Sequence, residues 1–81
     1  MNILAVELHL QAQNVTCTDI AIVVDLVDGR TVSAPLVWFP RLSCASPEQL
    51  NNWGLLGDGE GIHWPDVDED LSIAGLMVGT H

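Results

Sequence analysis

Apolar and polar residues alternate one by one near the start of the chain. Residues 6–11 read valine, glutamate, leucine, histidine, leucine, glutamine. A period of two is typical of a strand that has one face in the core and the other in water. Gln13-Asn14 then favours a loop. We therefore expect a half-buried strand over residues 6–11, followed by a loop.

The same alternation returns further along and predicts a hairpin. Residues 20–25 place their most apolar side chains at every second position, and β-branched residues dominate. Asp28-Gly29 favours a tight turn, because Gly29 accepts a positive φ. Residues 30–34 are then expected to return antiparallel. Pro35 is expected to end the pairing, since proline has no N–H to donate.

Helix signals follow the predicted hairpin. Ser46 is a good N-cap, and Pro47 suits the first helical position. We expect a helix from there to about Trp53 that stops at Gly54. The apolar residues 36–42 are interrupted by a proline and predict an irregular or single-turn segment.

Glycine, proline and acidic residues divide the rest of the chain into short pieces. Residues 57–61 favour a flexible turn, because a phosphate-binding loop would need a following Lys-Ser/Thr and would not carry two carboxylates. Residues 62–64 predict a short extended piece, and residues 66–70 a charged turn. Residues 71–73 then fit an extended piece or the start of a helix, and residues 74–81 a terminal helical turn.

These elements predict a single α+β domain over residues 1–81. We expect a small antiparallel sheet, made of the N-terminal strand plus the hairpin that turns at Gly29, with one central helix and a short C-terminal helix. A domain this short buries only roughly 60–65% of its unfolded surface. Hydrophobic residues nevertheless make up 48% of the chain. The composition therefore favours a well-filled core, or a core plus an apolar interface.

The charge balance narrows the classes of partner. Eleven acidic residues against two basic ones give a net charge of −9. Binding to nucleic acid phosphates needs clustered Lys and Arg, so direct nucleic-acid binding is not expected. A charge of this size steers association with a basic protein and is also consistent with mimicry of a nucleic-acid surface or with solubility alone.

Cysteine use and the hydropathy pattern favour a cytoplasmic protein. Cys17 and Cys44 fit no zinc-binding spacing. One disulfide is formally possible, but we expect two reduced thiols in the core. The first residues lack the basic start and cleavage site of a signal peptide, and no apolar run reaches the roughly 18–20 residues of a membrane span.

The densest chemistry lies in "GIHWPDVDEDLSIAG", residues 61–75. His63 is followed by four carboxylates: Asp66, Asp68, Glu69 and Asp70. The acidic spacing begins like a calcium loop, but leucine stands at its sixth position and methionine at its twelfth. A transition-metal site would need a second imidazole or a thiol close in space, and acid–base catalysis would need a second wall of a cleft. We expect no catalytic residue, metal or cofactor.

The same stretch has an architectural interpretation. The Trp64 ring is expected to pack inward and Pro65 to fix the direction of the chain. Asp66 suits an Asx turn or N-cap, and residues 68–70 suit the start of the last helical turn. Arg41, and in second place Arg30, are the cations available for a bidentate pair with these carboxylates.

A partner-binding interpretation does not exclude the architectural one. The chain has three tryptophans, one phenylalanine and no tyrosine. These rings are expected to form the core, but an exposed one would anchor an interface, and Trp38 in "LVWFP" is our choice. The carboxylates of residues 66, 68, 69 and 70 would then add steering charge.

Several signatures resemble a known family. "FPRL", followed by "AS" and "EQ", and "GIHWP", followed by "DEDLS", are similar to small bacterial proteins of domain-of-unknown-function family 2442. The resemblance covers roughly residues 15–79 and implies a small α+β domain, sometimes fused ahead of a helix-turn-helix segment. It also implies a gene beside that of another short uncharacterised protein, as in a toxin–antitoxin pair. This sequence ends at His81, so the DNA binding of the fused members is not carried over.

Three functional hypotheses follow. The first is a non-enzymatic acidic interaction module, an antitoxin-like or regulatory partner of a small basic protein. The second is an inhibitor of phage or plasmid type that mimics nucleic-acid charge and blocks a nucleic-acid-binding enzyme. The third is a small metal-binding or hydrolytic protein that uses His63 and the nearby carboxylates.

Overall fold

A computed structural model describes residues 11–78. Most of the predicted strand over residues 6–11 lies outside this range, as does the end of the predicted C-terminal turn. The first antiparallel sheet has the order β1-β2-β3, with β1 Ala12–Cys17, β2 Ala21–Leu26 and β3 Thr31–Pro35. The second has the order β4-β5-β6, with β4 Gly54–Leu56, β5 Gly61–Trp64 and β6 Glu69–Ser72.

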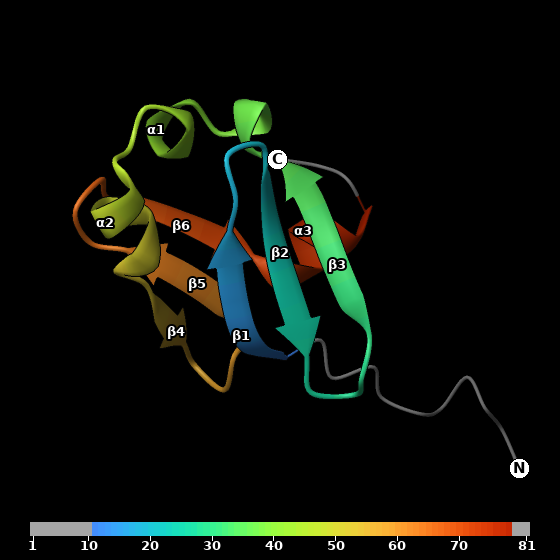
Figure 1. Ribbon diagram of the computed structural model, residues 1–81. Coiled ribbons are helices and arrows are strands. Elements are labelled where there is room, and N and C mark those ends of the chain that lie inside the picture. The colour runs from blue at the N-terminus through green and yellow to red at the C-terminus, as the bar shows by residue number, and fades with distance from the viewer. Residues whose placement is uncertain (1–10, 79–81) are drawn as a thin grey trace, which may run out of the picture.

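Short helical segments join the two sheets and follow the second. These are the 3-10 turn η2 Leu36–Trp38, α1 Pro40–Ser43, α2 Pro47–Asn51 and α3 Ile73–Val78. Figure 1 shows the second sheet passing behind the first, with α1 and α2 at one end of both. The predicted α+β class is confirmed.

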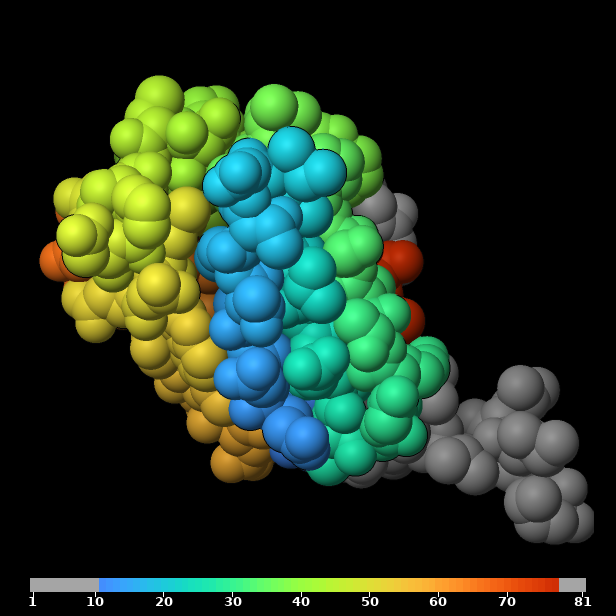
Figure 2. Space-filling model, viewed as in Figure 1, coloured from blue at the N-terminus to red at the C-terminus, as the bar shows by residue number. Residues whose placement is uncertain are grey.

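One core lies between the sheets. Its buried side chains come from both sheets and from the helical segments between them: Ala12, Val15, Ile22, Val24, Leu26, Ala34, Leu36, Phe39, Leu42, Leu50, Ile62, Trp64, Leu71 and Ile73. On the face of the first sheet that points away from the second sheet, the three strands lie next to one another and form a continuous surface (Figure 2). The alternation predicted for residues 20–25 is confirmed within β2, where every second residue is fully buried.

The hairpin forms where it was predicted, with a three-residue loop. The Gly29 N–H donates to the Leu26 carbonyl at 3.0 Å, and the Leu26 N–H donates to the Arg30 carbonyl at 2.8 Å. Gly29 has a φ of +98°, which supplies the left-handed residue of this loop type. Asp28 accepts a hydrogen bond from the Arg30 N–H and pairs with its guanidinium at 2.7 Å. Arg30 is therefore engaged within the hairpin.

Two predictions for the first sheet need correction. Gln13-Asn14 is part of β1, not a loop, and the pairing register shifts between Ala12 and Asn14. The extra residue, Gln13, forms a β-bulge. An edge strand tolerates such a bulge when the side chain of the extra residue points to solvent. Pro35 is the last residue of β3 and lies opposite Ala21. Its missing N–H costs nothing, because this position points away from β2.

The predicted start of α2 is confirmed, but the helix ends earlier than predicted. The Ser46 hydroxyl accepts from the Gln49 N–H, and the Gln49 side chain accepts from the Ser46 N–H, which forms a capping box. Pro47 is the first helical residue, as predicted, but α2 ends at Asn51 and not near Trp53. The following residues enter β4 at Gly54, so the second sheet ends the helix early.

The second sheet was not predicted as a sheet, although the extended piece predicted over residues 62–64 is confirmed within β5. Its strands have only three or four residues, too short for a clear period. The turn between β4 and β5 is fixed to the first sheet, because the Ala12 N–H donates to the Gly59 carbonyl at 2.6 Å. A Cβ at Gly59 would lie 2.7 Å from the Ala12 carbonyl oxygen, and φ there is +95°. The glycine-rich run is thus a close contact between the two sheets.

Candidate partner-binding groove

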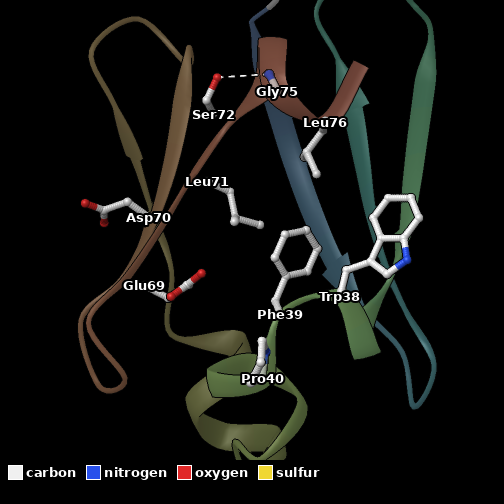
Figure 3. Close-up of a pocket in the computed structure, with 9 residues that line it drawn as sticks. All are labelled: Trp38, Phe39, Pro40, Glu69, Asp70, Leu71, Ser72, Gly75 and Leu76. Atoms are coloured by element: carbon white, nitrogen blue, oxygen red, sulfur yellow. Dashed lines mark hydrogen bonds between the residues drawn. The ribbon is translucent and has the colours of Figure 1, made fainter. Parts of the chain in front are cut away.

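A groove of about 370 Å³ lies between the segment that follows β3 and the last strand. Trp38, at the end of η2, forms one wall together with Phe39 and Pro40. The opposite wall is the whole of β6, residues 69–72, and Gly75 and Leu76 of α3 complete the lining (Figure 3). The turn after β5 reverses the chain and brings β6 opposite Trp38. Residues more than 30 positions apart therefore meet in one place.

The floor of the groove is apolar. Phe39 and Leu71 point toward one another across it (Figure 3), and both are more than nine-tenths buried. The Trp38 ring stands edge-on to Phe39, with ring centroids 6.5 Å apart and an interplanar angle of 67°, an arrangement that aromatic pairs favour. Trp38 is 40% exposed, so its ring is accessible at the lip of the groove.

Further apolar surface adjoins the Trp38 lip. Ile20 and Val37 are 76% and 74% exposed. The Leu36 N–H donates to the Ile20 carbonyl at 2.8 Å, which holds the β1–β2 turn against η2, and Figure 2 shows these two segments side by side. Sequence reasoning placed Ile20 among the inward positions of a strand. It lies one residue before β2 begins, and the alternation gave no signal of that boundary.

The predicted carboxylates do not share one face. The Glu69 side chain lies on the groove side of β6, and the Asp70 side chain lies on the opposite side (Figure 3). This split follows from the strand itself, because successive side chains point to opposite faces. The prediction that residues 68–70 begin the last helical turn is wrong, since α3 begins at Ile73 and has no acidic residue in its first turn.

The turn that precedes β6 holds the other two carboxylates. Asp66 accepts a hydrogen bond from the Asn52 side-chain amide at 3.0 Å. Asp68 has a φ of +54°, a left-handed conformation that aspartate tolerates in turns. The Arg41 guanidinium donates to the Asp68 carbonyl at 2.7 Å and lies 3.9 Å from the Glu69 carboxylate. Arg41 thus meets the acidic segment as predicted, through a backbone acceptor in place of a bidentate carboxylate pair.

Trp64 and Pro65 lie where the architectural interpretation placed them. Trp64 is fully buried, and its indole N–H donates to the Leu50 carbonyl at 3.0 Å. Pro65 directly follows β5 and begins the turn, which the Val67 N–H closes on the Trp64 carbonyl. The indole therefore ties β5 to α2 across the core.

Within the described part of the chain, His63 contacts one carboxylate, that of Asp70. It lies opposite Asp70 in the β5–β6 pairing, and its Nδ1 atom contacts the Asp70 carboxylate. Over residues 11–78, no group of three or more His, Cys, Asp or Glu side chains is placed to hold a metal ion. No helix in that range has the length and apolar composition that a membrane crossing requires.

The cysteines differ from the expectation that both lie in the core. Cys44 is exposed, Cys17 is half-buried, and both are free thiols. Burial raises the pKa of the Cys17 thiol. Cys44 follows the single turn α1 at the surface, a position for which the apolar sequence around it gave no signal.

The fold and groove define a small acidic α+β domain, built from two three-stranded antiparallel sheets with an apolar furrow at one edge. The chain belongs to the family described as "Protein of unknown function (DUF2442)", whose profile matches residues 12–81. The resemblance stated from the sequence is therefore confirmed.

A solved structure is similar over most of the chain. The crystal structure of a protein of unknown function from Rhodospirillum rubrum ATCC 11170 matches with a TM-score of 0.76 and 35% sequence identity. The match covers 89% of each chain. No functionally curated protein matches the sequence.

Proposed function

We propose that this protein is a non-enzymatic, cytoplasmic interaction module, an antitoxin-like or regulatory partner of a small basic protein. The observation that carries the proposal is the groove, which combines an exposed aromatic lip, Trp38, with the Glu69 carboxylate on the opposite wall. Trp38 and Glu69 were selected from the sequence for different reasons, as an anchor and as steering charge. They line the same furrow.

The groove has the composition of a binding surface. Interface cores are enriched in aromatic residues and surrounded by polar ones, and a few large side chains carry most of the affinity. Here Phe39, Leu71 and Leu76 supply an apolar floor, with Trp38 at the edge.

Charge favours a basic partner. The net charge of −9 attracts a cationic protein at long range, and complementary charge raises association rates more than affinity. The resemblance to family members whose genes neighbour another short protein suggests where to look for such a partner. The split of Glu69 and Asp70 to opposite faces of β6 gives no phosphate-like row there, so we do not advance the mimicry hypothesis. The single His63–Asp70 contact likewise gives no support to a metal-dependent or hydrolytic function.

The test is co-expression of the chain with the product of the adjacent gene, followed by size-exclusion chromatography. We expect the two proteins to elute together, Trp38→Ala to weaken the complex by about tenfold or more, and Glu69→Lys to slow association. Asp58→Lys is the matched control, because it changes the net charge equally at a residue outside the groove lining. Separate elution of the wild-type proteins would refute the proposal.

A further inference from the structure

The last strand of the second sheet is an edge strand. In the order β4-β5-β6, β6 pairs with β5 on one side only. The Ile73 N–H donates to the Glu60 carbonyl, so these two residues form a hydrogen-bonded pair. Counting from this pair along the β5–β6 register shows which residues of β6 are hydrogen-bonded to β5. Antiparallel pairs alternate between residues whose backbone groups face the partner strand and residues whose groups face away. The N–H and carbonyl of Asp70 and the N–H of Ser72 therefore face away from β5.

Of the backbone groups of these two residues, the Asp70 N–H, the Asp70 carbonyl and the Ser72 N–H have no backbone partner among residues 11–78. The Ser72 carbonyl is engaged, because Ser72 directly precedes α3 and accepts the first hydrogen bond of that helix. The outward groups border the groove, since all four residues of β6 line it. Side chains on the two faces of β6 differ in kind. The Leu71 side chain forms part of the apolar floor of the groove, and the Asp70 side chain points away from the groove (Figure 3).

We propose that the groove receives an extended segment of the basic partner, which adds to the second sheet as a fourth, antiparallel strand beside β6. This inference rests on the proposed function and names the mode of recognition. Strand addition takes its affinity from main-chain hydrogen bonds and its specificity from pockets for alternate side chains. The Asp70 N–H and carbonyl and the Ser72 N–H supply the main-chain groups, and Phe39, Leu71 and Leu76 supply the pocket.

The occupant follows from the charges. A residue of the added strand opposite Asp70 projects its side chain to the same face as the Asp70 carboxylate, so lysine or arginine fits there. Its neighbours project into the groove and must be apolar. A second copy of this chain is a poor occupant, because antiparallel pairing of two β6 strands would bring their carboxylates together between two chains that each carry −9.

The probe is a synthetic peptide in which lysine and valine alternate over seven residues, labelled at its N-terminus for fluorescence anisotropy with the full chain. Two derivatives each carry three N-methyl groups on backbone nitrogens. In one derivative they are on three of the lysines, and in the other they are on the three valines. Lysines opposite Asp70 direct their N–H groups at β6, and the valines direct theirs away. We expect methylated lysines to weaken binding by about tenfold and methylated valines to leave it within about twofold of the parent peptide.

Chain variants add a second readout. Asp70→Asn should weaken binding of the parent peptide several-fold, and the matched control Asp58→Asn should not. No binding of the parent peptide, or equal affinity of the two methylated peptides, overturns strand addition. If the methylated peptides bind equally while co-elution with the gene neighbour still depends on Trp38, strand addition is wrong and the proposed function stands. If the peptide effect holds but the gene neighbour elutes separately, the groove binds extended basic segments and the antitoxin-like function is wrong.

Discussion

Trp64 offers the sharpest test of how this small domain is held together. Its ring is fully buried, and its indole N–H donates to the Leu50 carbonyl at 3.0 Å. Trp64→Phe removes that donor, and the side-chain donor to this carbonyl that then remains among residues 11–78 is the Cys17 thiol, 3.7 Å away. A buried carbonyl deprived of its partner costs about 1–2 kcal/mol, and the volume lost from the ring adds about 1 kcal/mol.

We therefore expect Trp64→Phe to lower the free energy of unfolding by about 2–3 kcal/mol. A domain of this length has a total of about 4–12 kcal/mol, so the variant should still fold. The midpoint of thermal unfolding should fall by about 10–20 °C. Circular dichroism during heating and urea titration measures both quantities. Trp38→Phe is the matched control at the surface and should stay within about 0.5 kcal/mol.

A loss below about 0.5 kcal/mol for Trp64→Phe would refute the reasoning. It would mean that the indole hydrogen bond does not tie β5 to α2. A loss of the same size in both variants would equally contradict it, because the Trp64 ring is fully buried and the Trp38 ring is 40% exposed.

Three further predictions address single positions. Gly59→Ala should lower the free energy of unfolding, measured by urea titration, by about 2 kcal/mol or more, because the new Cβ would lie 2.7 Å from the backbone of β1. Gly54→Ala is the control and should change this free energy little, because the space beside Gly54 is open. Equal effects of the two substitutions would contradict the close contact at Gly59. Cys44 should react with a thiol reagent faster than Cys17, because burial raises the pKa of the Cys17 thiol; equal rates would contradict the assigned burial. The hydrogen bond that Arg30 donates holds the pKa of Asp28 below its usual value of 3.8. The difference in thermal stability between wild type and Asp28→Asn should therefore be complete above pH 3.8 and vanish as the pH falls through the lowered pKa. A difference that does not change in acid would refute this.

The hairpin of β2 and β3 was predictable because it carries local signals, whereas β1 was not predicted at its observed position. β2 alternates over its full length, and Gly29 marks a turn whose chemistry depends on one residue. Ser46 likewise marks the start of α2 through a local capping box. The bulge in β1 was not predictable, because Gln13 is left without a partner only through the register in which β1 pairs with β2.

The second sheet and the groove depend on long-range contacts. Three- and four-residue strands show no period, and their pairing is favoured by burial of Ile62, Trp64 and Leu71 against the first sheet. The groove joins Trp38 to β6, two segments that no local pattern connects. Trp38 and Glu69 were selected from the sequence for separate roles, and the structure places both in the lining of the groove. Asp70 was expected on the same acidic face as Glu69, because the acidic run was interpreted as a turn and not as a strand.

The central claim is that a basic partner binds in the groove beside β6. The most direct measurement is an NMR titration of the ¹⁵N-labelled chain with the purified product of the adjacent gene. We expect the largest shifts at the backbone amides of residues 69–72 and at the Trp38 indole N–H. Shifts confined to the outer face of the first sheet, with the groove signals unchanged, would contradict it.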